Sequence, residues 1–252
     1  MLLTVSLVGC TTSADKSAIT TKQSSEPNFK EASKINVQLA IGYIKRKQYT
    51  PARDKLEKSI EQNPDYAPAY KTLAYLYALL GLPEKADETY QEAIDLKPND
   101  PDLSNGYGAF LCSQGNYEEA QKYLSVAYSD PFYEARYLAE SNAGSCYIKQ
   151  NKYKKAETLL RASLRKQSKL AGSLISMAEI GVKTERYLMA RAYIQRYHAV
   201  KPATAESLWI QIQAEKNLGA KEHYMKYARK LIKDFPDSDE AGWAEAEVRG
   251  KR

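Results

Sequence analysis

The chain has 252 residues, of which 43% are hydrophobic and 27% are charged, and its formal net charge at pH 7 is +6. A mean hydropathy of −0.59 leaves no long apolar span, which excludes a polytopic membrane protein. The length fits one domain or a short repeat array, and the Gly and Pro content is that of a folded chain. Because basic and acidic residues are interleaved along the chain, we expect no nucleic-acid partner.

The chain begins with an apolar run, residues 1–9, that ends in a small residue immediately before Cys10. This arrangement resembles a bacterial lipobox, in which a peptidase reads Leu7, Val8 and Gly9 and Cys10 becomes the acylated first residue. No Lys or Arg precedes the run, and it is shorter than a complete secretory signal. We therefore interpret residues 1–9 as a partial signal segment and expect the true start upstream. The alternative is a frayed apolar tail with an ordinary thiol at Cys10.

A polar segment follows the cysteine. Eight of the residues 11–25 are Ser or Thr, so this stretch buries too little apolar surface to offset its ordering entropy. We expect a lipidated flexible tether over residues 10–32 and a folded domain over residues 33–252. Thr11 follows the cysteine where an Asp commonly retains lipoproteins in the inner membrane, so the resemblance to lipoproteins implies sorting to the outer membrane, on its periplasmic face.

The prolines of the folded part indicate an internal repeat. Pro64 and Pro98 are 34 residues apart, as are Pro202 and Pro236, and three further periods plus two residues separate Pro98 from Pro202. This register is the tetratricopeptide signature, in which small residues let the first helix of a repeat approach the second and Pro ends the second helix. The small residues recur twelve positions apart, at Ala40 and Ala52, Ala74 and Ala86, Gly108 and Ala120, Gly144 and Ala156, and Ala178 and Ala190.

We therefore predict an all-α fold, a right-handed tetratricopeptide superhelix of about six helix-turn-helix repeats. The repeats are expected to begin near residues 33, 67, 101, 137, 171 and 205. The two surplus residues fall around 130–132, where we expect a local kink. A coiled coil is excluded because no heptad pattern runs past the prolines.

Helix starts and the chain end carry capping signals. Asp100 followed by Pro101 predicts an N-cap with proline in the first turn, and Asp237 with Glu240 has the spacing of a capping box. The latter would open a terminal helix over residues 238–249, with Trp243 on its apolar side. Such a helix would cover the exposed end of the repeat stack.

Nothing in the sequence has the pattern of a catalytic or metal site. There is no Gly-rich phosphate loop, nucleophile elbow or cluster of His, Cys and acidic residues. His198 and His223 each lack a partner motif, and we interpret them as surface or packing residues. We predict that the chain is not an enzyme and that it holds no cofactor and no metal.

Cys112 and Cys146 are candidates for a disulfide. They occupy similar positions in the first helices of repeats three and four, which adjacent parallel helices would bring within reach of each other. An oxidising periplasm would permit the bond, but the bond also requires a narrow range of Cα separations. The alternative is a pair of small buried thiols.

The first helices of tetratricopeptide repeats line the concave face of the superhelix. In the first two repeats this lining is partly apolar, and in the third it turns polar. Apolar residues that do not serve the core are best explained by a docked partner segment. The alternative is that the tether or a neighbouring helix covers the lining of the first repeat. The predicted groove residues are Lys34, Val37, Ile41, Ile44, Lys71, Tyr75, Leu79 and Asn105.

Two segments in the middle of the chain resemble a particular family. Repeat three reads Asn105-Gly-Tyr-Gly-Ala-Phe-Leu-Cys-Ser-Gln-Gly-Asn-Tyr-Glu-Glu-Ala120, and repeat four has Asn142-Ala-Gly-Ser-Cys146 followed by Tyr153 and Ala156. These segments resemble the PilF/PilW family of type IV pilus biogenesis and stability proteins. The resemblance covers the lipobox, the short tether and six repeats.

The resemblance implies a function. Members of this family act as pilotins, outer-membrane lipoproteins that bind the pilus secretin, the channel for the fibre, and promote its localisation and multimerisation. We expect the same role here, with the membrane reached through the lipid on Cys10 and the protein itself a monomer. The competing hypothesis is a tetratricopeptide lipoprotein scaffold that regulates cell-envelope enzymes acting on peptidoglycan, which would share the anchor and the groove.

Overall fold

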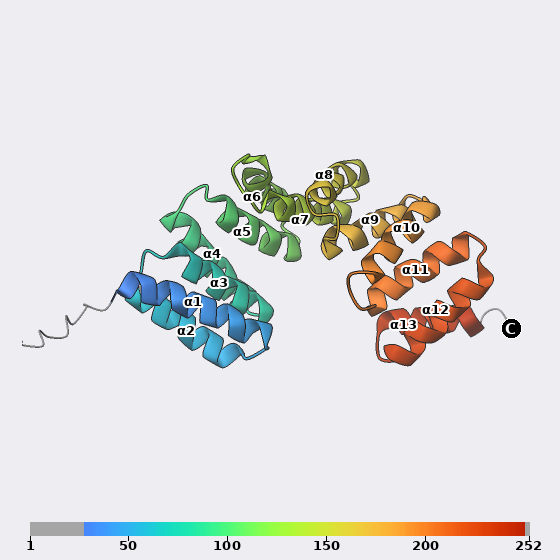
Figure 1. The fold of residues 1–252 in the computed structure, drawn as a ribbon, viewed down its shortest axis with the longest axis horizontal. Coiled ribbons are helices and arrows are strands. Elements are labelled where there is room, and N and C mark those ends of the chain that lie inside the picture. The colour runs from blue at the N-terminus through green and yellow to red at the C-terminus, as the bar shows by residue number, and fades with distance from the viewer. Residues whose placement is uncertain (1–27, 250–252) are drawn as a thin grey trace, which may run out of the picture.

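The computed structural model describes residues 28–249, which form thirteen α-helices and no strand. The first twelve pair into six helical hairpins that follow one another around an arch (Figure 1). None of the described helices combines the length and apolar character needed to span a membrane. The helices are α1 (Phe29–Lys45), α2 (Tyr49–Gln62), α3 (Ala67–Leu79), α4 (Pro83–Leu96), α5 (Pro101–Ser113), α6 (Tyr117–Ser129), α7 (Arg136–Lys149), α8 (Tyr153–Lys166), α9 (Ala171–Lys183), α10 (Tyr187–His198), α11 (Ala205–Asn217), α12 (Lys221–Asp234) and α13 (Asp239–Arg249).

The six hairpins confirm the predicted repeat, with first helices that begin at or within four residues of the expected positions. The predicted small residues lie where the two helices of a hairpin meet, and the alanines among them have no exposed surface. The two glycines are required by close packing. A Cβ added at Gly108 would lie 2.7 Å from the Cγ of Leu124, and one at Gly144 would lie 2.6 Å from the Cγ of Leu160.

The curvature of the array follows from which helices touch. Each odd-numbered helix contacts the next odd-numbered helix as well as its own partner, whereas no two even-numbered helices of the described chain are in contact. The odd-numbered helices therefore form the inner layer of the arch, and the even-numbered helices are splayed on its outer side. This arrangement places the concave surface on α1, α3 and α5, as the sequence predicted.

The turns within the hairpins also repeat. Each contains one residue in the left-handed region, at Lys47, Gly81, Gly115, Asn151, Glu185 and Gly219, with φ between 57° and 83°. These residues are 34 apart except across the middle of the chain, where the interval is two residues longer. The surplus residues lie between α6 and α7, where the ring of Phe132 is 90% exposed.

Two boundaries differ from the sequence-based expectation. The first helix begins at Phe29, because the side chain of Asn28 accepts a hydrogen bond from the backbone N–H of Glu31. Residues 29–32 are thus helical and not part of a tether. At the other end, the hydroxyl of Ser238 accepts from the backbone N–H of Ala241, so Ser238 caps α13 and the predicted box starting at Asp237 is wrong.

The terminal helix closes the array as expected. Ala241 and Ala244 of α13 are buried in a core cluster with Leu208, Ile212 and Leu231 of the last hairpin. Trp243 is half exposed, and its ring lies 5.4 Å from that of Trp209, measured between centroids. The predicted cap at Asp100 is confirmed, because its side chain accepts from the N–H groups of Asp102 and Leu103 at the start of α5. Thr204 caps the first helix of the last hairpin, α11, in a similar way.

Candidate partner-binding groove

A groove lies on the concave surface where α1, α3 and α5 meet. Its volume is about 260 Å³, and its lining contains four of the predicted groove residues. Ile41 and Tyr75 supply uncovered apolar surface, since they are 39% and 49% exposed. The lining consists of Ile41, Lys71, Thr72, Tyr75, Tyr90, Asp102, Asn105 and Gly106.

The floor of the groove is aromatic and rigid. The ring of Tyr90 reaches it from α4 on the outer layer and is 3% exposed. Its centroid lies 5.4 Å from that of Tyr107 and 5.4 Å from that of Phe110. Burial, together with nearby Tyr75 and Asp102, raises the pKa of Tyr90 above its ordinary value of 10.0, so the hydroxyl stays protonated.

The rim of the groove is polar and its side chains are already paired. Lys71 of α3 forms an ion pair with Asp102 of α5. Asp102 also accepts a hydrogen bond from the hydroxyl of Tyr133 at 3.1 Å. One helix further, the amide of Asn142 donates to the side-chain oxygen of Asn105 at 2.9 Å. These contacts fix the inner helices relative to one another and leave polar edges beside an apolar patch.

The structure brings together half of the predicted groove residues. Ile41, Lys71, Tyr75 and Asn105 line the same hollow. Leu79 lies one turn beyond Tyr75 on α3 and is 44% exposed, so it extends the apolar surface.

Besides Leu79, three predicted residues do not line the groove, and these three do not extend its apolar surface either. Val37 is 6% exposed and belongs to the core cluster of α1, α2 and α3, and Ile44 is half-buried against the same cluster. A neighbouring helix covers Val37, which was the alternative considered from the sequence. Lys34 is exposed near the start of α1 and pairs with Glu31 at 3.3 Å.

Tyr90 is the groove residue that the sequence analysis missed. The equivalent positions of three other repeats are Leu56, Leu124 and Leu160, which are fully buried aliphatic residues. A larger ring at that position extends further toward the concave side, and Gly106 leaves room for it, since a Cβ there would touch the Tyr90 ring at 3.5 Å. An aromatic residue where the other repeats hold Leu is the signal that could have found it.

The two cysteines of repeats three and four form a disulfide in the structure. It joins Cys112 of α5 to Cys146 of α7, with Cα atoms 5.8 Å apart. Both residues are buried. The bond ties together the inner helices at the far edge of the groove. Cys10, the predicted lipidation residue, lies outside the described residues.

The remaining candidate positions are structural. The Nε2 atom of His198 lies 3.0 Å from the hydroxyl of Ser207, and burial lowers the pKa of this histidine. His223 is exposed beside the buried Glu215. Among residues 28–249 there is no group of three or more His, Cys, Asp or Glu side chains that could hold a metal. The absence of catalysis stays a prediction.

Comparison with known proteins places the chain in a family. Family models described as tetratricopeptide repeat match residues 43–102 and 89–122. The type IV pilus assembly protein PilF of Pseudomonas aeruginosa is 30% identical over 237 residues, which are 94% of this chain and 92% of that protein. The chain belongs to the PilF/PilW family of type IV pilus biogenesis proteins.

Solved structures of the PilF/PilW family share the fold along nearly their full length. The crystal structure of PilW, described as a widely conserved type IV pilus biogenesis factor, matches with a TM-score of 0.75 and 29% identity over 83% of this chain and 96% of PilW. The structure of Pseudomonas aeruginosa PilF matches with a TM-score of 0.76 and 29% identity over 87% of this chain and 99% of PilF. The predicted fold and family are thus confirmed.

Proposed function

We propose that this protein is an outer-membrane lipoprotein of type IV pilus biogenesis that binds the pilus secretin and promotes its localisation and multimerisation. The observation that carries the proposal is the groove between α1, α3 and α5, which presents uncovered apolar surface in a chain of the PilF/PilW family. No covalent chemistry is needed for this role. It requires affinity for the secretin and attachment to the outer membrane.

The groove fits a segment of another protein. Its volume of about 260 Å³ suits one or a few side chains. Tyr75 and Ile41 offer apolar contact for those side chains, and the floor under them is held by stacked rings that do not have to rearrange. Asp102 at the rim has an exposed carboxylate that can accept a further hydrogen bond from the backbone of the bound segment. Pre-formed contacts of this kind lower the entropic cost of binding.

The proposed lipid anchor would allow binding of secretin subunits to promote their assembly. Acyl chains on Cys10 would attach the protein to the bilayer, since more than one chain gives durable attachment. A secretin subunit held in the groove would then be confined near the membrane, where its effective concentration toward other subunits rises. The lipid would determine where secretin multimers form, and the groove would determine whether subunits are held.

The experiment that tests this role uses a deletion strain complemented with wild-type protein or with Cys10→Ala. Envelope fractions are compared for heat-resistant multimers of the pilus secretin and for their distribution between the two membranes. We expect the deletion to lose multimers, and Cys10→Ala to retain the protein but to misplace or reduce them. Normal multimers in the outer membrane of the deletion strain would contradict the proposal and favour the scaffold for envelope enzymes.

A further inference from the structure

The positive charge of the chain is concentrated in its second half, contrary to the interleaving that the sequence analysis described. Residues 149–201 contain thirteen Lys and Arg against three Asp and Glu, whereas the whole chain has a net charge of only +6. The rest of the chain is therefore slightly acidic. Seven of these cations lie on α8 and α10, which belong to the outer layer of the arch (Figure 1).

These cations form one continuous surface, which we call the basic face. Lys154 and Lys155 line a hollow at the start of α8 that also includes Thr184 of the turn before α10. Arg161 and Arg165 line a second hollow, of about 320 Å³, together with Arg196 of α10. The exposed cations of the basic face are Lys154, Lys155, Arg161, Arg165, Lys166, Arg186 and Arg196.

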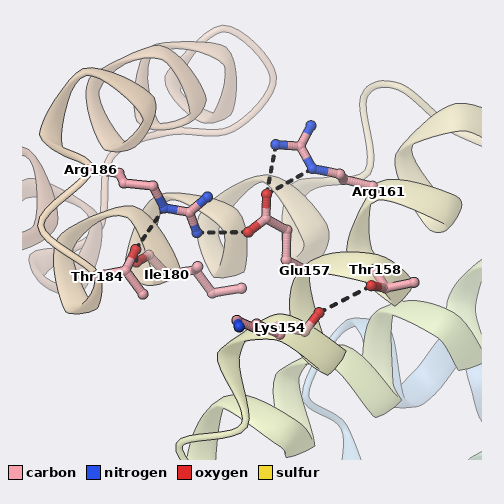
Figure 2. Close-up of polar contacts among 7 residues, drawn as sticks. All are labelled: Lys154, Glu157, Thr158, Arg161, Ile180, Thr184 and Arg186. Atoms are coloured by element: carbon pink, nitrogen blue, oxygen red, sulfur yellow. Dashed lines mark hydrogen bonds and ion pairs between the residues drawn. The ribbon is translucent and has the colours of Figure 1, made fainter.

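A single carboxylate organises the centre of this face. Figure 2 shows Glu157 between two guanidinium groups, with Arg161 and Arg186 each donating at 2.7 Å. Arg186 is held further by the hydroxyl of Thr184, which accepts from its Nε at 2.9 Å. One negative charge is thus shared by two positive charges, and the arrangement ties α8 to the start of α10 without neutralising the face.

Most other cations of the basic face have no carboxylate partner in the described chain. Lys154 and Lys166 form no ion pair, and Arg196 donates to the backbone oxygen of Ser168 at 3.0 Å. Arg165 interacts electrostatically with Glu140 of α7, which lines a further hollow together with Arg165 and Lys166. Glu185, in the turn before α10, is an exposed acid next to Arg186, but the cations of the basic face outnumber it. The face therefore keeps a strong positive potential that is available to an external partner.

The outer layer also carries the opposite charge at a separate place. α4, four helices before α8, has five Asp and Glu against one Lys. Because α4 contacts neither α8 nor α10, these acids do not neutralise the basic face. A molecule charged in this way would orient itself near an anionic surface, with α8 and α10 toward the surface and α4 away from it.

We propose that the basic face of α8 and α10 docks on an anionic phospholipid surface. The cations are spread over two helices and the turn before α10, and the hollows between them are open, which suits the distributed phosphates of lipid headgroups better than one bound peptide. Leu188 supports this choice. It lies in the first turn of α10, close in sequence to Arg186, and is 68% exposed. An apolar side chain among cations favours the interfacial region of a bilayer. The inference concerns a different surface from the groove and does not depend on secretin binding.

The test is co-sedimentation of the full chain, carrying Cys10→Ser so that no acyl group contributes, with vesicles of phosphatidylcholine alone or mixed with phosphatidylglycerol. We expect binding to the mixed vesicles and not to the neutral ones. Raising the salt from about 0.1 M to about 1 M shortens the Debye length from about 10 Å to about 3 Å and should release the protein.

Two charge-reversal variants distinguish the effect of the basic face on vesicle binding from the effect of the net charge of the chain. Lys154→Glu/Arg165→Glu/Lys166→Glu should weaken partitioning by at least about tenfold. Lys30→Glu/Lys58→Glu/Lys97→Glu changes three exposed cations elsewhere and should bind like the parent chain. No binding to the anionic vesicles, equal loss in both variants, or tight binding of poly-glutamate or duplex DNA without vesicle binding would overturn the proposal.

Discussion

Glu157 is the residue on which the geometry of the second half of the outer layer depends. Its side chain is 19% exposed and accepts hydrogen bonds from two arginines on different elements. The hydrogen bond from Arg186, and then that from Arg161, lowers the pKa of this carboxyl below its ordinary 4.5. Because the pKa is lowered in the folded state, the contribution of Glu157 to stability is complete above about pH 4.5 and is lost as the pH falls through the folded-state pKa.

Glu157→Gln is therefore expected to lower the free energy of unfolding by about 1 kcal/mol near neutral pH, a modest value because both arginines are partly exposed. Thermal unfolding of the two proteins, followed by circular dichroism from about pH 6 to about pH 3, should show the difference shrink as Glu157 is protonated in the wild type. Glu118→Gln is the control, since the Glu118 side chain is 90% exposed. A difference in melting temperature that stays constant with pH would contradict the assigned role.

Side-chain partners were the part of the site that the sequence could not supply. The pattern predicted that Ile41, Lys71, Tyr75 and Asn105 face the same side, because each lies on a first helix at a concave register position. It could not predict that Val37 turns into the core, since that depends on how closely α3 packs on α1.

The helices were predictable because the same sequence pattern occurs in successive repeats. Prolines recur 34 residues apart and paired small residues recur in five repeats, so an ambiguous signal in one repeat is corrected by the others. The terminal helix has no second copy, and there the cap predicted at Asp237 is wrong, because Ser238 caps the helix. Whether two cysteines at similar repeat positions are joined depends on the spacing of α5 and α7, which the period does not give.

The disulfide between α5 and α7 should stabilise the middle of the array. It closes a loop of 34 residues, and its loss is expected to cost about 2–4 kcal/mol. In a Cys10→Ser background, reducing agent should lower the denaturant midpoint of the parent chain to that of Cys112→Ala/Cys146→Ala, and should leave the double variant unchanged. A parent chain whose midpoint does not respond to reduction would contradict a stabilising bond.

At the scale of the whole molecule, the arch separates two surfaces. The groove lies on the inner layer of the first three repeats, and the basic face lies on the outer layer of the fourth and fifth. Since the two surfaces share no residue, one can bind a protein segment while the other contacts a membrane. The sequence predicted the inner surface from the register of the first helices, but the outer one emerged only from the structure, in which side chains of α8 and α10 line one hollow.

The most direct test of the central claim is the dissociation constant between the purified full chain and the purified pilus secretin, measured for wild type, Tyr75→Glu and Leu80→Glu. Tyr75 lines the groove, whereas Leu80 is similarly exposed, at 41% compared with 49%, but lies outside the lining. We predict that Tyr75→Glu raises the dissociation constant at least about tenfold, as for a buried aromatic anchor, and that Leu80→Glu binds like wild type. Wild-type affinity in Tyr75→Glu would contradict binding of the secretin in this groove.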